Sequence, residues 1–312
     1  MSAARITARS FPTPDIVKTT NNPAAWDQLA GFAHVQAAEA NAALQLLGDR
    51  LATADTAQER TGVFEAAFRH VSEWRYQVAA DPQQRWTRPN SEVEAFRTPI
   101  PPGEWMGYRL TPTAVEGESG SPAVDLLTEL EQVAKDRLMN QLNLHNPVTL
   151  PDGRKVLGNL LDQGLRPGEV ITRTAGFADR EQLRRASFEI LAGLETQRAG
   201  TDGLDPHDPE LRQQFADAAY CLIQAPQMER GSDSIMRTFL AAAHTRVFDA
   251  APVLPQAIDL DGMVRGQDGF NQVMHDQLRV VLPVKESGLA ATESDRAPHD
   301  RAVRRAGGIA RW

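Results

Sequence analysis

The chain has 312 residues, of which 41% are hydrophobic, and it carries a formal net charge of -8 at pH 7. A chain of this length and apolar content can bury the core of one large domain or two small ones, which excludes disorder as its overall state. The acidic balance leaves no basic excess to neutralise a phosphate backbone, so we expect no nucleic-acid partner.

The single cysteine indicates the compartment of the protein, and the lengths of its apolar runs indicate whether it can associate with a membrane. Cys221 stands alone, which excludes an intramolecular disulfide and suits a reducing compartment; we interpret it as a small buried apolar residue. The first residues, MSAARITARSFPTPD, lack the apolar core of a signal peptide and a Met-Gly start for myristoylation. No apolar run approaches the roughly 18 residues of a membrane span. We expect a cytoplasmic protein with no membrane partner, or alternatively an effector delivered into a host cell.

The chain order begins with an arm and a helical pair. Residues 1–22 are rich in Ser, Thr, Pro and Asn without periodicity, and they are predicted to form an extended N-terminal arm. Apolar residues then recur at helical spacing over 24–51 and again over 57–78, which predicts an antiparallel pair of helices. We expect a single domain over 23–285 and a flexible, polar C-terminal tail over 286–312.

The stretch 81–120 contains six prolines and four glycines, too many breakers for regular structure. It also holds four aromatic residues, so we expect a loop that is packed or faces a ligand. These residues are Trp86, Phe96, Trp105 and Tyr108.

Further helices and one turn follow. Ser121 and Pro122 form an N-cap and first-turn pair for a helix that is predicted to reach about Leu142. In VTLPDGRKVLG, Asp152 and Gly153 stand between short apolar runs, which predicts a small β-hairpin with a primed turn. The fold class is therefore mainly α, a helical bundle with one small β-hairpin. The remaining helices are predicted at 179–196, 208–224, 230–248 and 267–278.

Common catalytic motifs are absent from the sequence. There is no Gly-rich phosphate loop, HExxH, GxSxG or paired-cysteine motif. The seven histidines are scattered, and His244 and His275 lie on predicted helices without a metal-binding partner four residues on. We therefore predict packed or solvent-facing histidines and no metal site.

The start of the helix after Glu229 has two interpretations. Arg230, Gly231 and Ser232 open the helix, so backbone N–H groups and a guanidinium converge where an anion would bind. Alternatively, Gly231 and Ser232 only begin the helix while Arg230 pairs with Glu229 or Asp233. Physical chemistry alone favours the second, structural interpretation.

Asp259 follows the proline-bounded segment VLPQAI and has a structural interpretation too, because Asp is favoured at the N-cap of a short helix. The order ERGSDS, an apolar helix, a proline-containing link, DLDGM and GQDGF over 226–270 resembles the avirulence protein B branch of the Fido (Fic/Doc-like) superfamily. The SEWR segment that ends at Arg75 and the pair Thr98-Pro99 are similar to two further segments of that branch. Thr111-Pro112 competes with Thr98-Pro99 for the Thr-Pro position.

The resemblance implies a Fido-like helical fold and a role for each matching residue. Arg230, with Gly231 and Ser232, would hold the diphosphate of a donor, since a guanidinium at a helix start matches phosphate geometry. Asp259 would contact the donor's sugar or orient the acceptor, and Thr98 would line the same pocket. No tightly bound cofactor is expected; a nucleotide or nucleoside-diphosphate sugar would be the donor substrate.

Two departures from the family pattern are visible. The motif HxFxDGNGR is absent, so no histidine is placed as a general base before an arginine loop. An aromatic pair and a histidine, found in that branch one helix before the RGS sequence, are replaced here by Ala219, Tyr220 and Cys221. The donor or acceptor pocket would differ accordingly.

The resemblance leads to one functional hypothesis and two alternatives. The first is a transferase that moves a deoxysugar, such as rhamnose, from a nucleotide-linked donor to a hydroxyl of a protein or small molecule. The second is a nucleotidyl or phosphoryl transferase on the same fold. The third is a non-catalytic Fido-like scaffold that binds a partner through the Pro-rich aromatic loop or the basic tail.

Overall fold

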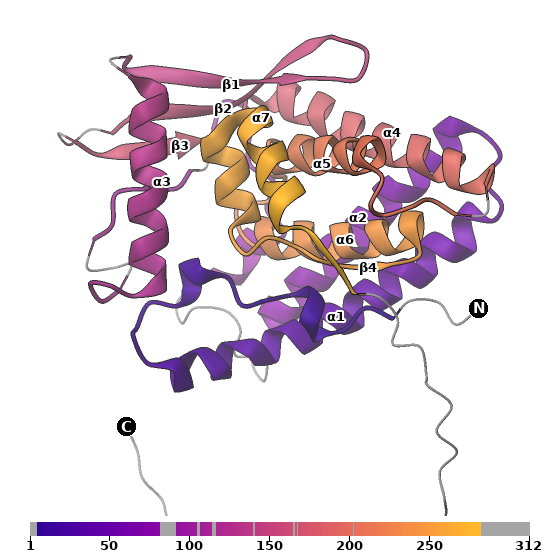
Figure 1. The fold of residues 1–312 in the computed structure, drawn as a ribbon, viewed down its shortest axis with the longest axis horizontal. Coiled ribbons are helices and arrows are strands. Elements are labelled where there is room, and N and C mark those ends of the chain that lie inside the picture. The colour runs from indigo at the N-terminus through magenta and orange to yellow at the C-terminus, as the bar shows by residue number, and fades with distance from the viewer. Residues whose placement is uncertain are drawn as a thin grey trace, which may run out of the picture.

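The computed structural model describes residues 5–81, 92–104, 107–113, 117–139, 141–164, 166, 168–201 and 203–281 (Figure 1). This part of the chain is mainly α-helical, with seven α-helices and two small antiparallel sheets, which confirms the predicted fold class. The helices are α1 Pro23–Leu51, α2 Ala57–Ala80, α3 Pro122–Leu138, α4 Phe177–Ala199, α5 Pro209–Ile223, α6 Ser232–Phe248 and α7 Ile258–Gln277.

Local sequence signals explain where three of these helices begin. The Asn22 side chain accepts a hydrogen bond from Ala24 N at the start of α1. Thr56 and Glu59 form a reciprocal capping box at the start of α2. The Asp208 carboxylate accepts from the first amides of α5, whose first residue is a proline. Such caps satisfy amides that have no partner within the helix, and each stabilises it by about 1 kcal/mol.

Helix α6 runs through the middle of a bundle that α1, α2, α4 and α5 complete (Figure 1). Thirteen of its 17 residues are buried, so it forms the centre of the hydrophobic core. Phe239 of α6 packs edge-on against Phe68 of α2 and Phe188 of α4, with ring centroids 5.4 and 5.8 Å apart. Full burial of each such side chain stabilises the fold by about 1.5–3 kcal/mol.

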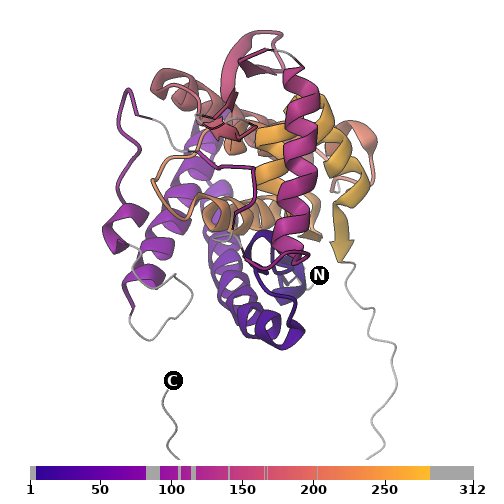
Figure 2. The same ribbon diagram turned by 90° about the vertical axis from the view of Figure 1, so that its left-hand side faces the viewer.

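The larger sheet lies at one end of α3, beside α7 (Figures 1 and 2). It contains β1 Asn143–Thr149, β2 Lys155–Gln163 and β3 Val170–Arg173, all antiparallel and in that order. The predicted hairpin is thus present, and a third strand extends it. A second sheet, absent from the prediction, pairs β4 Ala251–Val253 with β5 Arg279–Val281.

The turn between β1 and β2 differs from the predicted primed turn. Gly153 N donates to Leu150 O at 2.8 Å, so Pro151 and Asp152 are the central residues of the turn. Only Gly153 has a positive φ, of 82°, whereas a type I′ turn needs positive φ at both central residues. Proline, whose φ is fixed near -65°, favours an ordinary turn followed by a left-handed glycine.

Helix α7 begins nine residues earlier than the predicted start at Gln267, and it is kinked. Gly266 has φ 72° and interrupts the helical backbone. The Arg137 guanidinium donates a hydrogen bond to Val264 O, a carbonyl of the turn that precedes the kink. The sequence did not predict the first two turns of this helix, because the glycine and the buried acidic residues before the kink interrupt the apolar periodicity.

Three buried amide side chains fix the first part of α7 against the sheet. Asn146 Nδ2 and Asn159 Nδ2 donate to Met263 O at 2.9 and 2.7 Å. Gln224 Nε2 donates to Gly262 O at 2.8 Å, and its Oε1 accepts from Asn159 N at 2.7 Å. Buried polar networks of this kind rigidify what they contact, because each lost bond would leave a desolvated polar group.

The end of α3 and the N-terminal arm also differ in detail from expectation. Helix α3 ends at Leu138 rather than near Leu142, because Met139 adopts φ 52°. In the arm, residues 5–22 include two short 3-10 helices, and Ile6 and Phe11 are buried in the main core. The tail at 286–312 lies outside the described residues.

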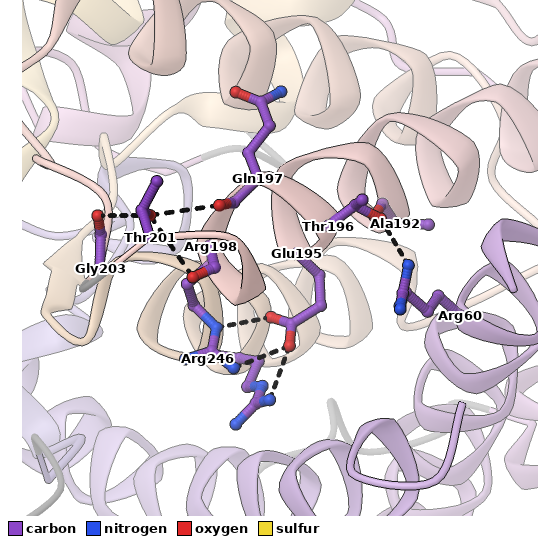
Figure 3. Close-up of polar contacts among 9 residues, drawn as sticks. All are labelled: Arg60, Ala192, Glu195, Thr196, Gln197, Arg198, Thr201, Gly203 and Arg246. Carbon is purple, nitrogen blue, oxygen red and sulfur yellow. Dashed lines mark hydrogen bonds and ion pairs between the residues drawn. The ribbon is translucent and has the colours of Figure 1, made fainter. Parts of the chain in front are cut away.

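A buried ion-pair cluster joins α4 to α6 (Figure 3). The Glu195 carboxylate, whose side chain is 3% exposed, accepts two bonds of 2.8 Å from Arg198 and one of 2.6 Å from Arg246. Arg60 of α2 donates to Thr196 Oγ1 of α4 at 2.9 Å in the same view. The cluster connects the end of α4 to the end of α6, and the separate Arg60 hydrogen bond connects α4 to the start of α2.

Across the described ranges, no helix combines the length and the apolar character needed to cross a bilayer.

Of the aromatic residues in the predicted loop, Phe96 is buried and Tyr108 is 40% exposed. Trp86 and Trp105 lie outside the described residues. The loop also contains a short 3-10 helix, η3 Val93–Phe96.

Candidate functional site

Two segments that are far apart in the sequence meet just before α6. Ile100 N donates to Gln227 O at 2.9 Å, and Glu229 N donates to Thr98 O at 3.0 Å. Arg230 N donates to Ala95 O at 3.1 Å. The segment that carries Thr98 is therefore held against the segment that leads into the predicted anion site.

The start of α6 has no side-chain cap. Gly231 is the N-cap residue, with φ 80°, and it has no side chain with which to accept from the helix amides. The Ser232 hydroxyl instead donates back to Met228 O at 3.1 Å. Among the described residues, the first-turn amides therefore have no side-chain acceptor, and they give this end of the helix a positive partial charge.

Arg230 does not form the pairs that the structural interpretation of this segment requires. Its side chain is exposed, and among the described residues it has no ion pair with Glu229 or Asp233. The Asp233 carboxylate instead bonds Arg237 at 2.6 Å, one helical turn further on. Within the described ranges, the Arg230 guanidinium thus has no ion-pair partner.

Asp259 is the second residue of α7, and Ala257 occupies the N-cap position, so the N-cap interpretation was wrong. The Asp259 side chain is 5% exposed. Its Oδ1 lies 3.8 Å from Arg237 Nη2, too far for a hydrogen bond. The carboxyl group of Asp259 is therefore buried, and the charge of Arg237 compensates its negative charge only in part.

The pKa of Asp259 is raised to about 7, mainly by burial and also by the neighbouring Asp233 carboxylate, while the charge of Arg237 opposes both effects. Burial also raises the pKa of Asp261, against the opposing effect of its hydrogen bond from Arg265. A carboxyl group that titrates near neutral pH can accept or donate a proton under physiological conditions. Asp259 therefore remains a candidate for proton transfer at this site.

A small cavity brings the starts of α6 and α7 together. Ser232 and Asp233 line it from α6, Asp259 lines it from α7, and Ser72 and Tyr108 close other sides. Its volume is about 20 Å³, which is room for about one water molecule. A donor of nucleotide size would have to bind at the mouth of this cavity or widen it. Arg230, Gly231 and Thr98 are not among the residues that line it.

The two candidate threonines occupy different environments. The Thr98 hydroxyl donates to Glu94 O at 2.8 Å, at the end of η3. The Thr111 hydroxyl donates to Glu131 Oε1 at 2.9 Å and accepts from Val170 N at 3.1 Å. Thr111 therefore joins α3 to the sheet, and Thr98 is the threonine beside the start of α6.

Ala219, Tyr220 and Cys221 face the core rather than the cavity, and all three are fully or almost fully buried. Tyr220 packs against Phe270 with ring centroids 5.4 Å apart, and burial raises its pKa. Burial raises the pKa of the free Cys221 thiol to about 12, which confirms its reading as a buried apolar residue. His244 is also buried, so the packed interpretation of this histidine is confirmed.

Three residues at this site were not singled out from the sequence as candidates. Asp233 and Arg237 are four residues apart on α6, the spacing at which charged side chains pair on a helix, and this signal was available. Arg75 of α2 was noted only within the SEWR segment. Its side chain packs against the start of α6, a long-range contact that no local pattern predicts.

A much larger hollow lies elsewhere. A cleft of about 750 Å³ is formed by the tip of the hairpin, α4, α5 and the second part of α7. Its lining includes Asp217, whose carboxylate accepts from Gln267 at 2.9 Å and from Asn271 at 3.0 Å. None of the residues predicted from the sequence as site residues lines this cleft. In the described part of the chain, no group of three or more His, Cys, Asp or Glu side chains is arranged to hold a metal ion.

No protein-family model matches the chain, and no curated protein matches it in sequence.

Proposed function

We propose that the protein is a transferase that takes a group from a nucleotide-linked donor and moves it to a hydroxyl of a protein or small molecule. The group is a deoxysugar such as rhamnose, as the Fido resemblance of the segment 226–270 implies. The observation that carries the proposal is the cavity in which residues from the start of α6 meet the buried Asp259 carboxyl. An uncapped helix start attracts an anion, and the carboxyl group beside it can accept or donate a proton.

The proposal assigns roles to three residues. Arg230 and the amides that follow Gly231 hold the diphosphate and stabilise the charge that develops on it as it leaves. The acceptor oxygen forms a bond to the anomeric carbon of the sugar, and the bond from that carbon to the diphosphate breaks. The nucleoside diphosphate departs with the electron pair, and the acceptor's proton goes to the Asp259 carboxylate. Thr98 lies on the approach to this position.

Thermal stabilisation by a panel of nucleoside diphosphates, triphosphates and nucleoside-diphosphate sugars tests donor binding. A ligand at about 100 times its Kd stabilises the folded state by about 2.7 kcal/mol. We expect one donor class to raise the melting temperature of the wild type and of Arg185→Ala, a control on α4 whose side chain is 76% exposed. We expect Arg230→Ala to lose this response. A panel in which no ligand raises the melting temperature contradicts the proposal.

Product analysis tests the group that is transferred, with water as the acceptor. Glycosyl transfer releases a nucleoside diphosphate and a free sugar, whereas nucleotidyl transfer to water releases a nucleoside monophosphate. We expect the diphosphate as product, and we expect Asp259→Asn to bind the donor but to release product much more slowly. Release of the monophosphate alone would favour the nucleotidyl transferase alternative.

A non-catalytic scaffold is the second candidate, and two observations favour it. The cavity of about 20 Å³ is smaller than any nucleotide, and Arg230 lies outside its lining. A scaffold would bind no donor and release no product. The same panel therefore separates the two functions.

A further inference from the structure

Arg75 is a buried cation for which the described residues supply no counter-charge. Its residue is 6% exposed, and among the described residues no carboxylate lies within ion-pair distance of its guanidinium. Burial lowers the pKa of this guanidinium to about 10, so it remains charged at neutral pH. A buried charge is ordinarily paired, because desolvation without compensation strongly destabilises the folded state.

The guanidinium has hydrogen-bond donors left over. Nε donates to Ser234 Oγ at 2.8 Å, whereas Nη1 is buried without a hydrogen-bond partner. The guanidinium carbon lies 4.3 Å from the Phe96 ring centroid and 5.6 Å from that of Phe32. The aromatic faces fix the orientation of the group, but they accept none of its remaining N–H bonds.

This guanidinium lies at the uncapped start of α6. Ser234 is the third residue of the helix, and its hydroxyl also donates to Gly231 O at 2.9 Å. A Cβ at Gly231 would lie 3.0 Å from Arg75 Cγ, so the Arg75 side chain runs directly beside the N-cap. The acidic residue of the first turn, Asp233, bonds Arg237 instead. A helix N-terminus and a buried guanidinium, two sources of positive charge, thus lie side by side, and no carboxylate of the described residues pairs with the guanidinium.

We propose that Arg75 is an anion-binding residue, and that its unpaired guanidinium and the first-turn amides of α6 together bind a phosphate or diphosphate group. A planar guanidinium offers two parallel N–H bonds to such an oxyanion, a geometry that a lysine cannot provide. This inference rests on the proposed function only in identifying the anion with the donor's diphosphate. It adds a second arginine, from α2, to the binding site.

Inorganic pyrophosphate is the probe, because it carries the charge of the donor without a nucleoside or a sugar. We expect it to raise the melting temperature of the full-length wild type, and of the control Arg69→Met, in a concentration-dependent way. Arg69 is on the same helix, and its side chain is 71% exposed. For Arg75→Met we expect the response to weaken by about tenfold or more in apparent Kd.

The same variant gives a second readout that a purely structural arginine would not give. Without pyrophosphate, Arg75→Met removes an uncompensated buried charge, so we expect its melting temperature to equal or exceed that of the wild type. A lower melting temperature without pyrophosphate, together with an unchanged pyrophosphate response, would show a structural role and overturn the inference.

Other outcomes are also decisive. Equal pyrophosphate responses in all three proteins, or no response in any of them, overturn the inference. If Arg75→Met does not fold, Arg75→Lys takes its place; we expect its pyrophosphate affinity to fall while that of Arg69→Lys does not. Donor turnover without a pyrophosphate response would leave the proposed function standing and refute the role of Arg75, so the two failures are distinguishable.

Discussion

Arg237 lies beside Asp259 without neutralising it. Its Nη2 is 3.8 Å from Asp259 Oδ1, while its three donor nitrogens bond Asp233, Pro255 O and Gln256 O. The guanidinium is thereby committed to a neighbouring carboxylate and to the backbone. This arrangement leaves the Asp259 carboxyl buried, near a like charge and only weakly compensated.

Asp259→Asn should therefore stabilise the protein in a pH-dependent way. The folded-state pKa of about 7 lies above the ordinary value of 3.8, so the folded state binds the proton more tightly than the unfolded state does. The stability that this provides is complete below about pH 4, and it is lost as the pH rises towards 7. The difference in melting temperature between Asp259→Asn and the wild type should therefore increase from about pH 4 to pH 7 and then level off. The corresponding gain in the free energy of unfolding is at most about 4 kcal/mol. Asp49→Asn, which removes an exposed carboxylate, is the control.

For the buried His244 we expect the opposite dependence of stability on pH. Its Nδ1 lies 2.8 Å from Ala250 O, and burial lowers its pKa from 6.5 to about 4. The neutral ring stabilises the fold fully above about pH 6.5, and this contribution is lost as the pH falls towards 4. His244→Gln should flatten the acid limb of the stability profile in urea titrations at a series of pH values. His275→Gln, at a position with a side chain that is 68% exposed, should keep it.

Gly231 should not tolerate a side chain. Its φ of 80° lies in the left-handed region, and an added Cβ would come within 2.8 Å of Phe96 Cδ1. Gly231→Ala should lower stability by about 1–2 kcal/mol for the backbone alone, and by more for the clash. Gly62, inside α2, has open space around its Cβ position, so Gly62→Ala should instead stabilise by about 0.5–1 kcal/mol. Equal effects of the two substitutions in urea denaturation would refute this assignment.

Most helices could be predicted because their apolar residues recur at helical spacing and their caps are local. Helix α2 illustrates this, since Thr56 and Glu59 are three residues apart and cap its first turn. Helix α7 could not be predicted in full, because Asp259 and Asp261 are buried and Gly266 breaks the periodic pattern. The pairing of β4 with β5 joins strands of three residues from distant parts of the chain, so it has no period to detect.

The candidate site was predictable only in its local part. The sequence singled out the α6 start at Arg230 and the acidic Asp259, because each follows a recognisable local order of residues. It left Thr98 and Thr111 as rivals, since only the tertiary fold shows that Thr98 O accepts from Glu229 N. Arg75 reaches the same place from α2 through contacts with side chains that are distant in sequence, and a local motif contains no such information.

The ion-pair cluster around Glu195 should be a large local contribution to stability. Removing the carboxylate charge in Glu195→Gln leaves Arg198 and Arg246, each about 20% exposed, without their shared counter-charge. Breaking a fully buried pair costs about 3–5 kcal/mol, and the partial exposure of the arginines places this cost at the lower end of that range. Glu189→Gln, on the same helix, removes a surface pair with Arg185 and should change stability by about 1 kcal/mol or less. Urea denaturation of both variants at neutral pH measures the difference, and a Glu195→Gln loss no larger than that of Glu189→Gln would show that solvent already screens the cluster.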